Sequence, residues 1–208
     1  MGCDHPDIEE FMRVKTDLDR VTKANMSLRV TDEFMDAVIE GKTVKLTFDR
    51  PETNDTVTKE LDASKFFEEF CNANYDYGEP GCLFWDKIKS LNMLSAYENF
   101  EYAGTNPCGE VPLPAGGSCL LGSMNLAAFV QNGQFKYEDF KKAVRIAIRA
   151  LNDVLDEGQP LHPLEEQRNT VKNWRQIGLG IMGLADMLIK MEKPYNSNNA
   201  RLNCSIIS

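Results

Sequence analysis

Apolar residues in the first third of the chain recur at two different spacings. Between Pro6 and Leu18 they lie three or four positions apart, which predicts a helix with one apolar face. Met26 to Val30 alternates apolar and polar side chains, which predicts a strand. Thr31 is a suitable N-cap for a second helix that ends at Gly41. A strand followed by a helix is typical of an α/β architecture.

The rest of the chain adds a hairpin and two more helices to this pattern. Alternation in Thr43–Phe48, a polar turn in Pro51–Asp55 and a short run in Thr56–Thr58 predict a surface hairpin. We expect Ser64 to open a helix that ends near Gly78. Apolar residues from Tyr137 to Leu155 keep a helical period throughout, which predicts the strongest helix of the chain.

The composition is that of an ordinary globular protein. Of the 208 residues, 42% are hydrophobic and 26% are charged, which is enough for one sizeable domain. The net charge of −9 argues against a broad surface for a nucleic acid polymer or for anionic lipid. Any nucleotide specificity must therefore come from a local pocket.

The chain has no sequence feature of a membrane protein or of a metal centre. No apolar run approaches the roughly 18 residues of a membrane span, and the acidic N-terminal sequence lacks the apolar core of a signal peptide. We therefore predict a cytoplasmic location. The six cysteines contain no C-x-x-C pair, and the two histidines are not at zinc-like spacing, which predicts thiols in a reducing compartment and no metal site.

The segment Asn106 to Glu110 reads NPCGE and places an amide, a thiol and a carboxylate within five residues. Prolines and glycines in and after it disfavour a regular helix, so we expect a loop that presents Cys108 beside Asn106 and Glu110. A second cysteine, Cys119, follows eleven positions later. Spacing alone favours a structural Cys108, because a single cysteine is more often a small buried hydrophobic residue than a reactive one.

The whole string from Asn106 to Leu126, with its C-x-L-G-S-x-N-L ending, resembles the active-site region of the large catalytic chain of ribonucleotide reductase. The resemblance covers Asp4 to Ala200 and implies part of a ten-stranded α/β barrel. We expect residues 1–200 to be a central fragment of that barrel and residues 201–208 to be a divergent tail. Further blocks resemble family segments in the same order: HPDIEEFMRVK (His5–Lys15), NMSLRVTDEFMDAV (Asn25–Val38), GEPGCLFWDKI (Gly78–Ile88) and RQIGLGIMGLADMLIKMEKPYNS (Arg175–Ser197).

The resemblance implies a role for each residue of the NPCGE loop. Cys108 matches the cysteine whose thiyl radical removes a hydrogen atom from C3′ of a ribonucleotide. Glu110 matches the general base on the 3′-hydroxyl, and Asn106 would hold the sugar hydroxyls. Pro107 and Gly109 would shape the loop around the substrate. Cys119 matches one of the two redox cysteines that supply the reducing electrons.

The same resemblance implies a cofactor and partners for the complete enzyme. The motif looks most like the adenosylcobalamin-dependent branch, class II, with thioredoxin or glutaredoxin as the reductant. The second redox cysteine lies upstream in the family and the substrate-phosphate loop lies downstream. We therefore expect the chain to be inactive alone, to bind no cofactor by itself, and to need the missing N- and C-terminal parts.

Two other interpretations stay open at this point. The chain could be a non-catalytic interaction fragment or a degenerate gene product. In either case a partial barrel is expected to leave sheet edges open, because a barrel removes its edges only when it closes. We expect strands near Met26 and Cys119 to expose Leu28, Leu120 and Leu121, and to promote self-association.

A third interpretation comes from Gly178 to Gly183, which satisfies the G-x-G-x-x-G pattern of dinucleotide-binding proteins. That fingerprint requires an acidic residue about 20 positions further on to hold the ribose. The corresponding sequence here, SNNARLNCSIIS, contains no acid. The pattern therefore favours small residues for close packing over an NAD-type oxidoreductase.

Overall fold

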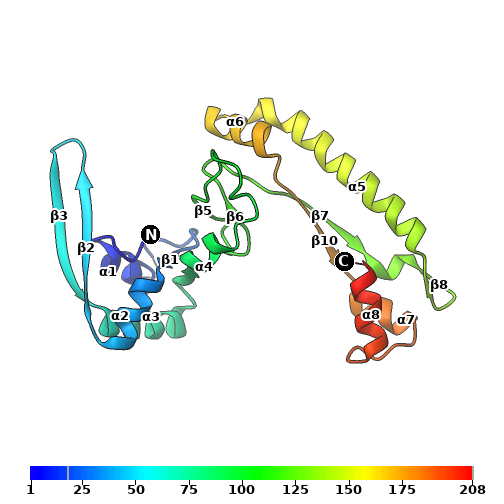
Figure 1. Cartoon of the computed structure of the whole chain (residues 1–208), viewed down its shortest axis with the longest axis horizontal. Helices are drawn as coiled ribbons and strands as arrows, with labels where there is room; N and C mark the ends of the chain where they lie inside the picture. Colours follow the sequence, from blue (N-terminus) through cyan, green and yellow to red (C-terminus); the bar gives the residue numbers. More distant parts are fainter. Residues whose placement is uncertain (18, 208) are drawn as a thin grey trace. The chain divides into compact units, whose positions relative to one another are not determined.

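The computed structural model describes residues 1–17 and 19–207 and divides them into two compact units (Figure 1). The first unit is Met1–Pro114 and the second is Ala115–Ser208. Each unit has its own packed residues and its own sheets. Among the described residues, no helix is both long and apolar enough to cross a membrane.

The first unit combines a parallel strand pair with helices and a long antiparallel hairpin. Strands β1 and β4 pair in parallel, with Leu28 opposite Cys82, and β2 pairs with β3 in antiparallel fashion. Its elements are α1 (Ile8–Arg13), η1 (Val14–Thr16), β1 (Ser27–Val30), α2 (Asp32–Glu40), β2 (Thr43–Arg50), β3 (Asp55–Asp62), α3 (Ala63–Tyr77), β4 (Gly81–Phe84), α4 (Trp85–Ser90), β5 (Gly104–Thr105) and β6 (Pro112–Leu113).

The second unit is built on one parallel strand pair, β7 and β10, with the long helix α5 running along it (Figure 1). Met187 and Leu188 of α7 pack with Leu126, Phe135 and Phe140 to form its core. Its elements are β7 (Leu120–Asn125), η2 (Leu126–Phe129), β8 (Val130–Gln131), β9 (Gln134–Phe135), α5 (Tyr137–Gly158), η3 (Gln159–Leu161), α6 (Glu165–Trp174), β10 (Ile177–Met182), α7 (Leu184–Lys190) and α8 (Asn198–Ile207).

Capping residues explain where the helices of the first unit begin and end. The Thr31 hydroxyl accepts a hydrogen bond from the Phe34 amide at 3.1 Å, and Gly41 ends α2 in the left-handed region at φ 66°, as predicted. The N-cap of α3 is Asp62 and not Ser64. The Ser64 hydroxyl instead donates to the Val38 carbonyl at 2.7 Å, which ties α3 to α2.

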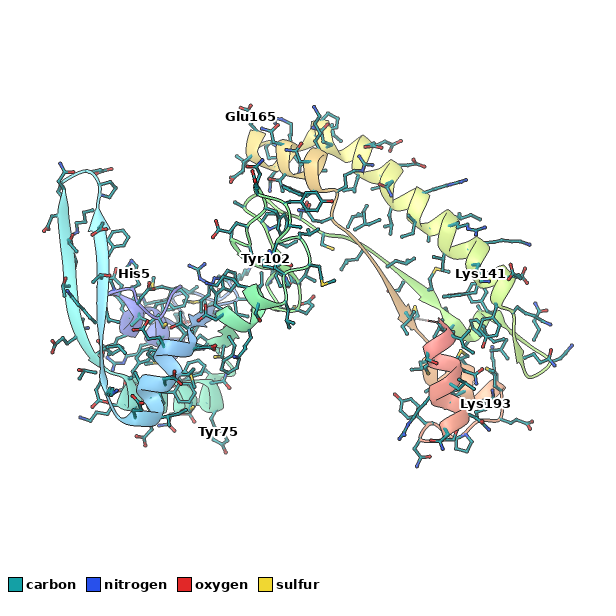
Figure 2. The ribbon with its side chains drawn as sticks, in the orientation of Figure 1. His5, Tyr75, Tyr102, Lys141, Glu165 and Lys193 are labelled. Atoms are coloured by element: carbon teal, nitrogen blue, oxygen red, sulfur yellow. The ribbon has the colours of Figure 1, made fainter. Side chains whose placement is uncertain are left out.

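The other predicted elements differ from the observed ones mainly in length. The first helix is α1 followed by η1, which ends at Thr16, and its predicted end at Leu18 lies outside the described residues. The hairpin is confirmed with eight residue pairs in register, more than the alternating pattern predicts. Phe48 lies in β2 of this hairpin. Its ring contacts the ring of His5, which Figure 2 labels, with the ring centroids 4.8 Å apart.

The strands form five separate two-stranded sheets within the described residues. The α/β class is therefore confirmed, whereas the strands of residues 1–17 and 19–207 form no closed ten-stranded barrel. The expected boundary between residues 200 and 201 falls inside α8, so it coincides with no break in secondary structure.

The core of the first unit corrects one expectation about exposed apolar residues. Leu28 is only 1% exposed and packs with Val30, Phe34 and Phe66, because α2 and α3 cover that face of β1. Leu121 of the second unit is 66% exposed, as expected. The edges of β1 are also paired, with β4 on one side and with Gly2 at Arg29 on the other.

We expect Leu28→Ala to lower the free energy of unfolding of the first unit by about 2–5 kcal/mol, because it leaves a cavity in a packed core. Leu91→Ala, at a position of the same unit that is 78% exposed, is the matched control and should change stability by about 0.5 kcal/mol or less. Urea unfolding followed by Trp85 fluorescence in a Trp174→Phe background reports on the first unit alone. Equal losses from the two substitutions would contradict the assigned core.

Candidate functional site

The NPCGE segment forms the connection between β5 and β6. These two short strands pair with Gly104 opposite Leu113, and the Asn106 amide donates to the Val111 carbonyl at 3.0 Å. The Gly109 amide donates to the Asn106 carbonyl, also at 3.0 Å, which closes a tight turn. Gly109 has a φ of 87°, a conformation that a residue with a Cβ rarely adopts. The predicted loop is confirmed, and Cys108 lies at its turn.

The side chain of Asn106 forms hydrogen bonds across this turn, to Glu110 and to Val111. Its Nδ2 donates to Oε1 of Glu110 at 2.5 Å, and its Oδ1 accepts from the Val111 amide at 3.0 Å. The amide therefore fixes the direction of the carboxylate through a charge-assisted hydrogen bond. The structure brings Asn106 and Glu110 together on either side of Cys108, whose side chain is exposed.

Residues distant in sequence form hydrogen bonds to the loop and to the residue before β5. The Asn25 side chain donates to the Pro107 carbonyl at 3.2 Å, and Nη1 of Arg29 donates to the Ala103 carbonyl at 3.2 Å. The Arg29 guanidinium also lies 5.1 Å from the ring centroid of Trp85, which holds its charge over an aromatic face. Figure 2 labels Tyr102, which directly precedes Ala103 and lies just before β5. These contacts join the loop and the residue before β5 to β1 and to the segment that precedes β1.

A cavity of about 580 Å³ lies beside the loop. Gly104, Asn106 and Pro107 form one part of its wall, while Lys23 and Arg29 supply cationic side chains to another part. The cavity is large enough for a small polar molecule. The sequence did not reveal Asn25, Arg29 or Trp85 as supporting residues, because the family-like blocks that contain them indicate no chemical role and the three residues lie more than 20 positions from the loop.

Cys119 lies in the second unit, at the entry to β7. The segment before it is fixed to α6, because the Thr170 hydroxyl donates to the Ala115 carbonyl at 2.9 Å. Gly116 has no room for a side chain: a Cβ there would lie 2.9 Å from Cγ of Glu166. The Leu120 amide donates to the Gln176 carbonyl at 3.3 Å, and Cys119 itself is half-buried. This rigid entry holds Cys119 at the start of the parallel strand pair.

All six cysteines are described, and all are thiols. Burial raises the pKa of the Cys3 and Cys82 thiols, so these two stay protonated and act as packed apolar side chains. Cys108, by contrast, is exposed at a turn. Within the described part of the chain, no group of three or more histidine, cysteine or acidic side chains is placed to hold a metal ion.

The G-x-G-x-x-G string does not form a dinucleotide-binding turn. Gly178 and Gly180 lie inside β10, and only Gly183, at φ 70°, stands between the strand and α7. A Cβ at Gly178 would lie 2.7 Å from Cδ2 of Leu121 on the neighbouring strand. The glycines therefore allow close packing within the strand pair, which is the interpretation that the sequence favours.

We expect no saturable binding of NAD, NADP or FAD to this chain. The glycine amides of β10 are in a strand and cannot form the phosphate-binding turn of that fingerprint. Isothermal titration of each dinucleotide into the protein tests this, with buffer injections as the control. A dissociation constant in the micromolar range, about −8 kcal/mol, would contradict it.

Comparison with known proteins places the chain in a family. The family model described as "Ribonucleotide reductase, barrel domain" matches residues 1–207. A vitamin B12-dependent ribonucleoside-diphosphate reductase of Mycobacterium tuberculosis is 36% identical over 201 residues, which is 96% of this chain and 28% of that protein. A protein of the same name from Thermoplasma acidophilum is 37% identical over 199 residues, 95% of this chain and 25% of that protein.

A vitamin B12-dependent ribonucleotide reductase of Streptomyces coelicolor is 28% identical over 229 residues, 97% of this chain and 23% of that protein. The chain thus spans about a quarter of the length of these relatives. The family model covers nearly every residue, and it includes positions 201–207 that we expected to be divergent. The chain therefore belongs to the ribonucleotide reductase family and matches its barrel domain.

Proposed function

We propose that this chain contributes part of the catalytic centre of a ribonucleotide reductase, which reduces ribonucleotides to 2′-deoxyribonucleotides. The observation that carries the proposal is the β5–β6 turn, where an exposed thiol lies between an amide and a carboxylate that are hydrogen-bonded to each other. No basic surface is needed for such a substrate, since a single nucleotide fits a local cavity.

Cys108 is the group proposed to act on C3′ of the ribose. As a thiyl radical, its sulfur takes the hydrogen atom from C3′, so that an S–H bond forms and a radical remains on the sugar. Exposure of the Cys108 side chain at a turn supports this role, because the sulfur must approach a substrate atom closely. The neighbouring Pro107 and Gly109 keep the backbone of the turn compact around it.

Glu110 is proposed as the general base for the 3′-hydroxyl. Its carboxylate takes the hydroxyl proton while the 2′-hydroxyl leaves as water after it has been protonated by a thiol. Asn106 directs the carboxylate through its Nδ2 and can also hold a sugar hydroxyl, because its amide has a second N–H. The hydrogen bond between Asn106 and Glu110 supports this division of roles.

Cys119 is proposed as one of the two thiols that reduce the sugar. Two electrons and two protons leave a thiol pair, which becomes a disulfide, and a thioredoxin or glutaredoxin then reduces that disulfide. The second thiol is assigned by family resemblance to a part of the enzyme outside this chain. We therefore expect the 208-residue chain alone to form no deoxynucleotide.

Adenosylcobalamin is the proposed cofactor of the complete enzyme, because the relatives are named as vitamin B12-dependent. When bound, it supplies a carbon-centred radical that can take the hydrogen atom of a thiol. The exposed Cys108 thiol fits this chemistry, since its S–H bond is accessible from outside the turn. We propose no residue of this chain as a ligand of the corrin ring.

A chimeric enzyme tests the proposal. Residues 1–207 of this chain would replace the matched segment of the Mycobacterium tuberculosis relative, which is 36% identical. We expect the chimera to form deoxynucleotide when ribonucleoside diphosphate, adenosylcobalamin and a dithiol are supplied. The unaltered relative is the positive control, and the 208-residue chain alone is the negative control.

Two outcomes would contradict the proposal. A folded chimera that forms no deoxynucleotide would favour a non-catalytic interaction fragment or a degenerate gene product. Deoxynucleotide formation by the 208-residue chain alone would show that no further thiol from outside the chain is needed. Circular dichroism and size-exclusion chromatography establish that each protein is folded before activity is compared.

A further inference from the structure

We propose that Gln176 is a positioning residue for Cys119, and that its side-chain amide donates a hydrogen bond to the Cys119 sulfur when the thiol is ionised. The proposal rests on the proposed function, in which Cys119 is a redox cysteine that must pass through a thiolate. It assigns Gln176 no contact with substrate. Its basis is the register of the second unit's strand pair and the burial of the Gln176 amide.

The register places Gln176 beside Cys119. Ile177 is opposite Leu120 in the parallel pair, and the Leu120 amide donates to the Gln176 carbonyl at 3.3 Å. Continuing the register by one position puts Gln176 opposite Cys119. Figure 1 shows the two strands side by side, with α5 along them.

The side chains of Gln176 and Cys119 lie on the face of the β7–β10 pair that is opposite to the face packed against α5. A Cβ at Gly122 would lie 3.7 Å from Leu151 of α5, so Gly122 and its neighbour Leu179 face that helix. Side chains alternate between faces along a strand, so the residues at 119 and 121 occupy the opposite face. Gln176 shares that face with Gly178 by the same alternation.

Because Gly178 has no side chain, the sulfur of Cys119 lies close to the backbone of β10. A Cβ at Gly178 would lie 3.5 Å from Sγ of Cys119. Gln176 is two residues away on the same face, about 6.6 Å along the strand. An extended glutamine side chain covers most of that distance. The proposed hydrogen bond forms by a change of the Gln176 side-chain rotamer when the thiol is ionised.

The Gln176 amide is buried without a partner. Neither its Nε2 nor its Oε1 has a hydrogen bond within residues 1–17 and 19–207, although both atoms are inaccessible to solvent. A buried amide without a hydrogen bond lowers the free energy of unfolding. A thiolate is an acceptor that would satisfy this amide. A hydrogen bond to the charged form of a group favours that form.

Charged groups on the packed helices do not replace this donor. On α5, Asp156 holds the Arg175 guanidinium by two hydrogen bonds, of which the shorter is 2.6 Å, and these lower the pKa of the Asp156 carboxyl. On α6, the Glu166 side chain lies against Gly116. The Gln176 amide is neutral, and the register places it on the strand next to Cys119.

The test measures alkylation of Cys119 against pH in the reduced 208-residue chain. Iodoacetamide is added between pH 6 and pH 10, and mass spectrometry of digested peptides separates Cys119 from the other five cysteines. We expect Gln176→Leu to raise the midpoint of the Cys119 profile by about 1 pH unit. The isosteric Gln176→Glu should raise it further, because it replaces the donor with a negative charge.

Internal controls distinguish positioning from a structural role. The Cys108 profile should not move in either variant, and Ser123→Ala, further along the same face of β7, should leave the Cys119 midpoint unchanged. Gln176→Leu should keep or raise the melting temperature, because it removes an unsatisfied buried amide. An unchanged Cys119 midpoint in both Gln176 variants would overturn the proposal, and so would unfolding of Gln176→Leu, which would assign the amide a structural role. The readout uses no nucleotide and no turnover, so it is independent of whether the chimera is active.

Discussion

Replacing Cys108 with serine in the chimeric enzyme is expected to abolish both deoxynucleotide formation and exchange of the 3′-hydrogen of the substrate. An O–H bond is much stronger than an S–H bond, so a serine hydroxyl cannot be converted to the radical that the reaction needs. Serine keeps the size and the backbone conformation of the turn. The hydrogen bond between Asn106 and Glu110 should therefore persist. A ribonucleotide labelled with tritium at C3′ reports the exchange directly.

Cys119→Ser is the matched variant and is expected to separate the two steps. Hydrogen abstraction by Cys108 does not require the second cysteine, so exchange of the label should continue. Deoxynucleotide formation should stop, because the reducing thiol pair is incomplete. Equal and mild losses in the Cys108 and Cys119 variants would contradict both assigned roles. A third substitution, Cys71→Ser at an exposed position of α3, should have no effect on either measurement.

The chemistry of the turn could be predicted from sequence because all of its parts are local. Asn106, Cys108 and Glu110 lie within five residues, and the glycine and prolines around them allow few backbone conformations. The loop and the proximity of the amide to the carboxylate follow from this spacing. The exposed thiol does not, because a single cysteine is more often buried. A local sequence cannot give the hydrogen-bond directions, and the structure adds that Asn106 contacts both Glu110 and Val111.

The supporting residues could not be predicted, because their contacts join distant segments. Asn25 reaches Pro107 across 82 positions of sequence, and Arg29 reaches Ala103 across 74. Neither residue belongs to a motif with a known chemical meaning. The same reason applies to Gln176, whose relation to Cys119 depends on the register of two strands more than 50 residues apart.

The fold was predictable where caps and alternation are strong. Thr31 and Gly41 fix the ends of α2, and alternation fixes the β2–β3 hairpin. The expected exposure of Leu28 was wrong because β1 has neighbours on both edges, β4 and the N-terminal residue Gly2, and its face is covered as well. Helices α2 and α3 cover the face of β1 whatever lies beyond its edge. No change in composition marks the boundary between the two compact units at Pro114, so the sequence does not indicate where it lies.

Glu110→Gln in the chimera is expected to lower the rate of deoxynucleotide formation by roughly 10²–10⁴-fold, the usual contribution of a general base. Glutamine has the shape of glutamate, and its Oε1 can still accept from Nδ2 of Asn106, so the turn should keep its conformation. The amide cannot take the proton of the 3′-hydroxyl. Exchange of the labelled 3′-hydrogen should therefore continue, since removal of that hydrogen atom needs only the Cys108 sulfur.

The control for charge alone is Glu101→Gln, which removes a carboxylate from the exposed approach to β5 and should leave the rate unchanged. Asn106→Ala provides a second comparison. It should reduce the rate even though Glu110 is intact, because the carboxylate loses the hydrogen bond that directs it. A rate within threefold of the unaltered chimera for Glu110→Gln, about 0.7 kcal/mol in the barrier, would mean that another group takes the proton. In that case the contact between Asn106 and Glu110 would serve only to close the turn around Cys108.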